Sequence, residues 1–278
     1  MLVTMKAVLD YAEAHNQAIG AFNVCSLEGI QATLEAAEEQ NQPVIIQFAP
    51  GHEPYISLDT IGPVMVLLAE KATVPVCVHL DHGDSIALVK KALELGFTSV
   101  MYDGSVLPFE QNVANTRMAV EIAEGYGASV EAEIGAMSGT EGTMVGHEAS
   151  YTDPDEAKKF VELTGVDGLA CSFGTVHGLY AAEPKLDFER ITNIRTKTGI
   201  PVVMHGGSGV SEPDFKECIN RGVRKINYYT YAAKAAGAAV KEYCNSVDDV
   251  VYFHDIMTCG REALKKDIME AMRIFSNK

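Results

Sequence analysis

Positive charge is scarce in this chain. Its 278 residues include 22 Lys and Arg against 38 Asp and Glu, which gives a formal net charge of −16 at pH 7. So large an excess of negative charge repels nucleic acids and anionic membrane surfaces, and both are excluded as partners. A small anionic ligand is not excluded, because a metal ion or a row of backbone N–H groups can reverse the field locally.

The chain also lacks the marks of export and of membrane insertion. No apolar stretch approaches the roughly 20 residues of a membrane span, and no basic segment followed by an apolar run, as in a signal peptide, opens the sequence. The six cysteines are scattered without CxxC spacing, at Cys25, Cys77, Cys171, Cys218, Cys244 and Cys259. We therefore expect a cytoplasmic protein with reduced thiols.

Segments of strand character and of helical character alternate from end to end. The expected strands cover 18–23, 43–47, 74–81, 99–103, 129–133, 168–172, 201–205 and 223–228. The expected helices cover 27–40, 61–71, 85–95, 109–126, 155–164, 188–198, 212–221, a long one from about 231, and 261–275. Eight such units without an interior linker indicate a (β/α)8 barrel, with a doubly wound sheet as the alternative. We expect one barrel domain over 1–278, with a helical extension over about 231–278.

Three histidines stand where apolar, β-branched runs end. His82 lies in VCVHLDHG, His177 in LACSFGTVHG and His205 in PVVMHGGSG. The carboxyl ends of barrel strands meet at one face, where three imidazoles can hold one metal ion and leave a fourth position open for a substrate. The pattern therefore predicts one catalytic Zn²⁺. His79, inside a strand, is expected to support Asp81 or to fill the barrel, and His52 is expected to have no special role.

Carboxylates gather at the same strand ends. Asp81 precedes the first histidine, and because Ser85 is the better cap for the following helix, Asp81 is left for proton transfer. Asp103 and Glu133 end neighbouring strands, and Glu131 faces the same side as Glu133. These acids are expected to support the ligands or to form a second cation position, with solvated strand-end acids as the alternative.

Two segments have the character of binding loops. Gly206-Gly207-Ser208-Gly209 follows the third histidine and can expose successive N–H groups to an anion. Barrels often bind phosphate after strands seven and eight, so this segment and 227–230 predict a phosphate site, with an ordinary turn as the alternative. Residues 138–153 are rich in Gly, Thr and Glu and show no period, and a loop of that length is often functional.

These residues together resemble the class II, metal-dependent fructose-bisphosphate and tagatose-bisphosphate aldolases. LDHG, MYDGS, EAEIG, GTVHGLY and HGGSG occur in order at the spacing of that family, from Ile19 to the last helix. The resemblance implies a lyase of carbohydrate metabolism, such as glycolysis. It would cleave a phosphorylated ketose to dihydroxyacetone phosphate and an aldehyde through an enediolate stabilised by zinc.

The resemblance also implies roles for single residues. His82, His177 and His205 would be the zinc ligands, and Asp81 the acid/base at the aldehyde-side hydroxyl. Glu141 would exchange a proton with the ketone-side carbon. Asp103 and Glu133 match acids near an alternative metal position. The substrate phosphate and a monovalent cation, Na⁺ or K⁺, would lie near Gly178, Gly206, Gly207 and Ser208, and other substrate contacts would come from Asn227 and Thr230. We expect a homodimer or a homotetramer.

Two positions depart from the fructose-type pattern. Tyr229 replaces the acid of the usual N-x-D-T after strand eight, and Ala49 stands where a serine is usual after strand two. The tail also lacks the frequent Gly-Ser-x-Gly-Lys ending. We expect weak cleavage of fructose 1,6-bisphosphate and better cleavage of another phosphorylated ketose, with tagatose 1,6-bisphosphate the first candidate.

Two other functions fit parts of the pattern. One is a metal-dependent hydrolase on a similar barrel, which usually takes a His-x-His pair from its first strand; this chain has none there. The other is a sugar-phosphate-binding barrel that has lost or changed catalysis. Ala49 and Tyr229 suit the second, whereas an intact Asp81 and Glu141 favour an enzyme.

Overall fold

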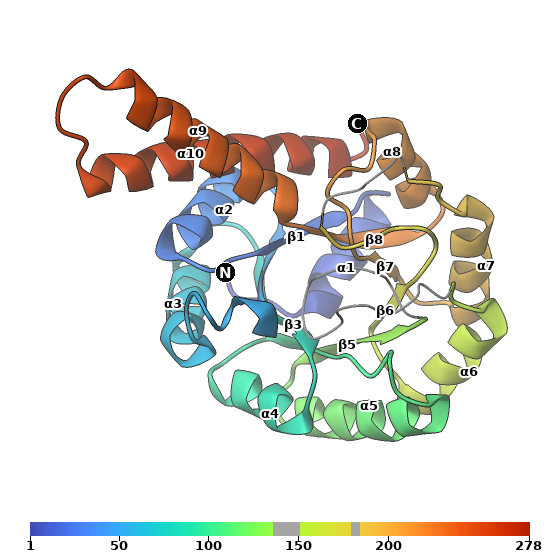
Figure 1. The fold of residues 1–278 in the computed structure, drawn as a ribbon. Helices are drawn as coiled ribbons and strands as arrows, with labels where there is room; N and C mark the ends of the chain where they lie inside the picture. Colours follow the sequence, from blue (N-terminus) through green and yellow to red (C-terminus); the bar gives the residue numbers. More distant parts are fainter. Residues whose placement is uncertain (136–150, 179–183) are drawn as a thin grey trace.

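A closed barrel of eight parallel strands forms the centre of the molecule (Figure 1). The computed structural model describes residues 1–135, 151–178 and 184–278. Each strand pairs with the next in the chain, and β8 pairs with β1. The strands are β1 (Ile19–Asn23), β2 (Val44–Phe48), β3 (Val76–Gly83), β4 (Ser99–Tyr102), β5 (Ser129–Ile134), β6 (Gly168–Cys171), β7 (Val202–Met204) and β8 (Val223–Tyr228). The predicted (β/α)8 barrel is therefore confirmed and the doubly wound sheet is wrong.

Helices α2 to α8 form a ring around the strands (Figure 1). Their bounds are α2 (Leu27–Gln40), α3 (Leu58–Lys71), α4 (Ile86–Glu94), α5 (Phe109–Glu124), α6 (Pro154–Thr164), α7 (Phe188–Thr198) and α8 (Glu212–Asn220), and a short 3₁₀ turn, η1, covers Pro50–His52. The Ser85 hydroxyl accepts a hydrogen bond from the N–H of Leu88 at 3.3 Å. Ser85 is thus the cap of α4, as predicted, and Asp81 is not needed there.

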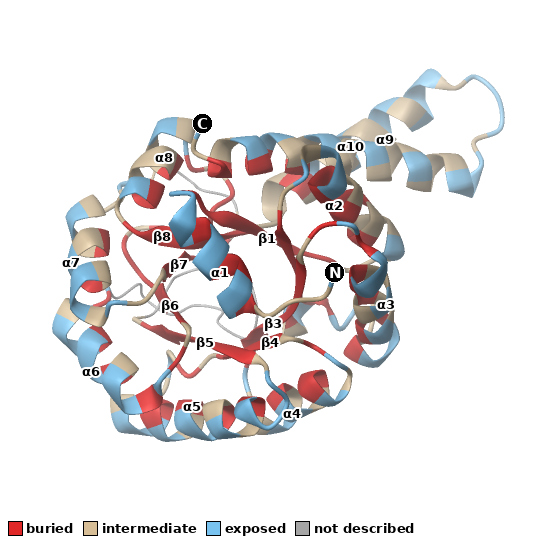
Figure 2. Cartoon of the chain, turned by 180° about the vertical axis from the view of Figure 1, so that it is seen from behind, coloured by how far each residue is buried: buried red, intermediate tan, exposed pale blue. Residues whose placement is uncertain are grey.

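A helix that the sequence analysis did not predict crosses the amino-terminal end of the barrel. This helix, α1 (Met5–Ala14), begins at Thr4, whose side chain accepts from the N–H of Ala7. Its apolar face packs against residues of β1, β2 and β3, in the cluster of Met5, Val8, Leu9, Ala12, Ile19, Ala21, Ile45 and Cys77. Figure 2 shows α1 lying across that end of the barrel. The strand ends that carry the histidines are at the opposite end.

Two long helices follow the barrel and project from one side (Figure 1). They are α9 (Thr230–Ser246) and α10 (Phe253–Phe275). α10 begins at Phe253, well before the predicted 261, and none of the residues in its first two turns is buried. Its last turn returns to the core, where Phe275 packs on Phe215 with ring centroids 4.9 Å apart. Within the described ranges, no helix is long and apolar enough to cross a bilayer.

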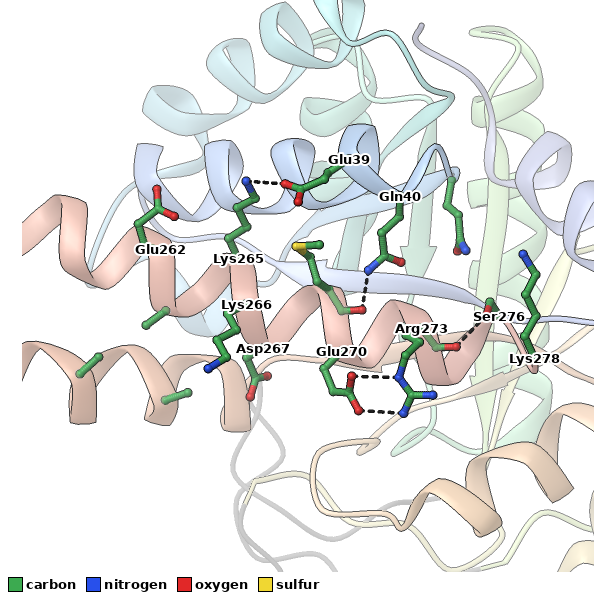
Figure 3. A pocket seen from close by; sticks show the side chains of 15 residues that line it. Glu39, Gln40, Glu262, Lys265, Lys266, Asp267, Glu270, Arg273, Ser276 and Lys278 are labelled. Carbon is green, nitrogen blue, oxygen red and sulfur yellow. Dashed lines mark hydrogen bonds and ion pairs between the residues drawn. The ribbon is translucent and has the colours of Figure 1, made fainter.

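A groove lies beside these two helices. It has a volume of about 1160 Å³ and is lined by residues of α2, α9 and α10 and of the C-terminus, among them Gln40, Lys266 and Arg273 (Figure 3). Gln40 donates a hydrogen bond to the Met269 carbonyl across it at 2.6 Å. The groove contains no residue from the segments that follow the strands, so it is separate from the histidine site.

Candidate active site

The three predicted metal ligands come together at the carboxyl ends of β3, β6 and β7. Their ring centroids lie 4.6 Å apart for His82 and His205, 5.1 Å for His82 and His177, and 5.8 Å for His177 and His205. One nitrogen of each lies within 4.8 Å of the other two, and all three side chains are buried. Three imidazoles that converge in this way have the arrangement of a site for one Zn²⁺.

His82 lies inside its strand rather than after it. β3 continues to Gly83, its pairing with β4 shifts between Leu80 and Gly83, and His82 has a left-handed backbone with φ of 48°. A Cβ on Gly83 would lie 2.5 Å from the Met101 carbonyl oxygen, so a glycine permits this close approach. The strand end at 81 was therefore predicted two residues too early, since the pairing shift depends on β4.

Carboxylates fix which nitrogen of two histidines faces the common centre. Asp103 lies 2.7 Å from Nδ1 of His82, and Glu131 lies 2.8 Å from Nε2 of His205. The opposite nitrogens, Nε2 of His82 and Nδ1 of His205, are buried and have no hydrogen-bond partner among the described residues. A buried polar atom without a partner is costly, and metal-binding histidines are commonly held by such carboxylates. These residues therefore fit a bound metal ion.

The charges around the histidines favour a cation at this centre. Burial lowers the pKa of His177 to about 3 and also lowers that of His205, so both imidazoles are neutral at pH 7 and suited to bind a metal ion. Burial acts in the same direction on His82, but the charges of Asp81 and Asp103 outweigh it and raise its pKa to about 10. The carboxylates thus attract a positive charge, which a metal ion would supply in place of the proton.

Asp81 is fully buried beside the histidines and is held by three amides. Its Oδ2 accepts hydrogen bonds from Asn23 at 2.9 Å and from Gln47 at 3.1 Å, and its Oδ1 accepts one from Asn227 at 3.0 Å. Burial raises the pKa of Asp81, but the charges of His82 and His205 lower it more, so the group is held ionised. Oδ1 lies 4.0 Å from Nε2 of His82, which places this carboxylate beside the proposed metal position.

The sequence analysis missed two of these supporting residues. Asn23 and Gln47 are polar residues at or near the ends of β1 and β2, and that position among apolar neighbours was the only available signal. His79 does not take the supporting role: its Nδ1 lies 2.8 Å from the Ser99 hydroxyl, inside the barrel. Of the two roles foreseen for His79, the structure favours filling the barrel.

A second layer of charge lies below the histidines. Glu131 pairs with Lys225 at 2.8 Å, and both side chains are fully buried. Burial raises the pKa of Glu131, but Lys225 and His205 lower it more, to about 2. Glu133 differs, because burial and the charge of Asp103 raise its pKa well above the ordinary value. His82, Asp103 and Glu133 also form a group with metal-ligand spacing, in agreement with the second cation position considered above.

The predicted phosphate residues surround one small cavity beside the three histidines. Gly178, Gly206 and Gly209 have left-handed backbones, and a Cβ on Gly206 would collide with the Val176 carbonyl oxygen. α9 begins at Thr230, so the first N–H groups of a 17-residue helix also lie here. The cavity is lined by Asn23, Gly178, Gly206, Gly207, Ser208, Asn227, Tyr228, Tyr229 and Thr230.

Tyr229 forms an aromatic wall of this cavity. Its ring meets the buried His52 edge to face, with centroids 4.8 Å apart, and its hydroxyl lies 3.6 Å from Sγ of Cys25. Ala49 is buried just before η1, which ends at His52. The structure thus gives His52 a packing role that the sequence analysis did not foresee. Glu141 lies in 136–150, outside the described residues.

The comparisons with known proteins agree with this site. The chain matches the family model of class II fructose-bisphosphate aldolases over residues 3–278. It is 41% identical to the probable fructose-bisphosphate aldolase of Bacillus subtilis (strain 168), over 99% of this chain and 98% of the relative. It is 40% identical to the fructose-bisphosphate aldolase of Staphylococcus aureus (strain COL), over 99% and 97%.

Solved structures give the same result. The YdjI aldolase from Escherichia coli K12 superposes with a TM-score of 0.89 at 37% identity, covering 99% of this chain and 97% of the other. A putative fructose-1,6-biphosphate aldolase from Coccidioides immitis superposes with a TM-score of 0.87 at 29% identity, covering 98% and 96%. The chain belongs to the class II fructose-bisphosphate aldolase family. It is therefore an aldolase, a carbon–carbon lyase of a family that is generally zinc-dependent and acts on ketose phosphates.

Proposed function

We propose that this chain cleaves a phosphorylated ketose to dihydroxyacetone phosphate and an aldehyde, and that it uses one zinc ion held by His82, His177 and His205. The observation that carries the proposal is the convergence of one nitrogen from each of these buried histidines to within 4.8 Å. The carboxylate of Asp81 beside them supports it. Family membership supplies the reaction class.

The residues around the proposed metal position have separate roles in cleavage. Zinc, when bound, polarises the ketone carbonyl and stabilises negative charge on the ketone half. Asp81 takes the proton of the aldehyde-side hydroxyl while the carbon–carbon bond breaks, and the bonding electron pair passes to the ketone half as an enediolate. Glu141 then returns a proton to the ketone-side carbon, which gives dihydroxyacetone phosphate. Asn23, Gln47 and Asn227 keep the Asp81 oxygens oriented.

The other predicted residues bind the substrate phosphate and further cations. The substrate phosphate binds in the cavity formed by Gly178, Gly206, Gly207, Ser208, Asn227 and Thr230, together with a sodium or potassium ion. Asp103 and Glu133 hold the alternative metal position. The substrate is a ketose other than fructose 1,6-bisphosphate, of which tagatose 1,6-bisphosphate is the first candidate. The enzyme works in the cytoplasm as a homodimer or homotetramer, and its six free cysteines fit a reducing compartment.

Metal analysis with two activity assays tests the proposal. The purified protein should contain about one zinc ion per chain, release dihydroxyacetone phosphate from a panel of ketose phosphates, and exchange a carbon-bound proton of dihydroxyacetone phosphate with solvent. A chelator should abolish both activities, and added zinc should restore them. Zinc-loaded protein that shows neither exchange nor release would instead be a sugar-phosphate-binding barrel without catalysis.

A further inference from the structure

A fully buried lysine lies inside the barrel, below the three histidines. Lys225 is part of β8, and because successive side chains of a strand point to opposite faces, it shares the inner face with Asn227. Among the described residues it is the only lysine that is buried. Burial of an ammonium group in a protein interior is costly. An apolar side chain could fill the same space, so the charge itself needs an explanation.

Lys225 reaches across the barrel to one oxygen of a carboxylate. Its Nζ lies 2.8 Å from Oε2 of Glu131 in β5, a strand that is not next to β8 in the barrel. The other oxygen, Oε1, lies 2.8 Å from Nε2 of His205. All three side chains are fully buried. Glu131 thus connects a cation to one of the proposed metal ligands and contacts each through a different oxygen.

Of the described lysines and arginines, only Lys225 forms an ion pair with Glu131. His79 also approaches Oε2, with its Nε2 at 3.7 Å, but burial lowers the pKa of His79 to about 3, so this ring is neutral. Arg224, the preceding residue, lies on the other face of the strand and pairs with Glu13 at 2.8 Å. Lys225 is therefore the basic side chain that compensates the charge of Glu131.

The carboxylate that contacts His82 is held in another way. Oδ1 of Asp103 accepts hydrogen bonds from the N–H of Ser105 at 3.1 Å and from its hydroxyl at 2.7 Å. Oε2 of Glu131 accepts no such hydrogen bond from the part of the chain that the structure describes. The ion pair with Lys225 takes the place of these neutral donors, so the orientation of Glu131 depends on that charge.

We propose that Lys225 is a positioning residue for the metal site: through Glu131 it keeps the proton of His205 on Nε2, so that Nδ1 directs its lone pair to the metal ion. This inference rests on the proposed zinc site. A carboxylate that accepts from the ring N–H of a metal-binding histidine fixes its tautomer and makes it a better ligand. A charged acceptor forms the stronger hydrogen bond, and Lys225 compensates its charge where solvent has no access.

A double-mutant cycle on zinc affinity tests the link. Lys225→Met removes the charge and keeps a long side chain, whereas Glu131→Gln keeps an amide oxygen that can accept from Nε2 of His205. Zinc dissociation constants of both variants, their combination and the wild type would be measured against a zinc-buffering chelator. Lys225→Met should weaken zinc binding by about 10- to 100-fold when Glu131 is present, and by less than about threefold in the Glu131→Gln background. An equal effect in the two backgrounds, or none in the first, would overturn the inference.

A matched control separates loss of stability from loss of zinc affinity. Arg224 is buried on the same strand and pairs with Glu13 of α1, at the opposite end of the barrel. Arg224→Met should lower the melting temperature of the apoprotein and leave the zinc dissociation constant unchanged. A loss of affinity as large as in Lys225→Met would show that reduced stability alone is the cause. If Lys225→Met does not fold, Lys225→Gln, which can still donate to Glu131, replaces it in the cycle with the same expected result.

The visible spectrum of the cobalt-loaded protein provides a measurement that depends on the ligands. The bands of Co²⁺ change with ligand geometry, so they should shift in Lys225→Met and stay as in the wild type in Arg224→Met. Unshifted bands in Lys225→Met would contradict a role in orienting His205. Zinc binding by the wild type distinguishes the two proposals. Its absence would refute the zinc site itself, whereas tight binding that Lys225→Met retains would refute only the role of Lys225.

Discussion

The two sides of the active site are built in different ways. On the metal side, His82 and His205 each contact a carboxylate, so charge and hydrogen bonds orient these two rings beside His177. On the cavity side, glycine backbone, amide groups and the ring of Tyr229 form the walls, so shape and dipoles dominate. A change on the metal side leaves a buried charge or polar atom without its partner, which is costly. A change on the cavity side mainly alters the space that a substrate can fill, so substrate choice is easier to change than reaction class.

Removal of one of the proposed metal ligands should reduce activity more than any other change. His177→Ala leaves two imidazoles, so zinc content and cleavage should fall together, the latter to the assay background. Metal analysis and release of dihydroxyacetone phosphate would be measured on the same preparation. His254→Ala, at an exposed histidine in the first turn of α10, is the control and should change neither. Stoichiometric zinc with unimpaired turnover in His177→Ala would remove it from the metal site.

Neutralising Asp81 should separate chemistry from metal binding. Asp81→Asn keeps the size of the side chain and lets it accept hydrogen bonds through its carbonyl oxygen, so zinc and the fold should be retained. Cleavage should slow by roughly 10²–10⁴-fold, the usual scale for general acid–base catalysis. Turnover and zinc content of the variant provide the measurement. If zinc is lost while the circular dichroism spectrum is unchanged, Asp81 is a ligand or its support rather than the proton carrier.

Changing Asp103, which contacts His82, should have a smaller effect, and this effect should be confined to metal affinity. Asp103→Asn weakens the hold on Nδ1 of His82, and changes of this kind usually cost about 10- to 100-fold in affinity. A titration of the apoprotein against a zinc-buffering chelator measures it, while turnover at saturating zinc should change less. An unaltered affinity would show that Asp103 does not support the ligand.

Changes on the cavity side should alter preference while keeping the reaction. Ala49→Ser with Tyr229→Asp restores the groups usual in fructose-type members, and a hydrogen bond to a charged group is worth about 1.5–3 kcal/mol. We expect kcat/KM for fructose 1,6-bisphosphate, weak in the wild type, to rise roughly ten- to a hundredfold. Position 229 caps α9 without a side-chain hydrogen bond, so an aspartate there is well tolerated.

Tyr229→Phe is the control for this double variant, because it keeps the ring against His52 and removes only the hydroxyl. It should not improve cleavage of fructose 1,6-bisphosphate. Efficient cleavage of that sugar by the wild type, unchanged in the double variant, would show that neither departure affects specificity.

The sequence predicts the barrel and the convergence of the three histidines because both follow from local patterns. Alternating segments indicate the strands, and a polar residue after each strand reaches the common end of the barrel. Asn23 and Gln47 were not predicted as site residues, because the position of an amide at a strand end does not show which acid it will bind. α1 was not predicted because it precedes the first strand, and the role of His52 depends on Tyr229, far away in the sequence. The boundary of the extension near 231, and its membership in one domain with the barrel, stay predictions.

The position of α1 has a consequence for substrate entry and product release. Because Met5, Val8, Leu9 and Ala12 of this helix cover the amino-terminal end of the barrel, the proposed metal, sugar and products would all enter and leave at the opposite end. If the ketone half binds to zinc and to the glycine-lined cavity, as proposed, it has more fixed contacts than the aldehyde half. The aldehyde is then expected to leave before dihydroxyacetone phosphate.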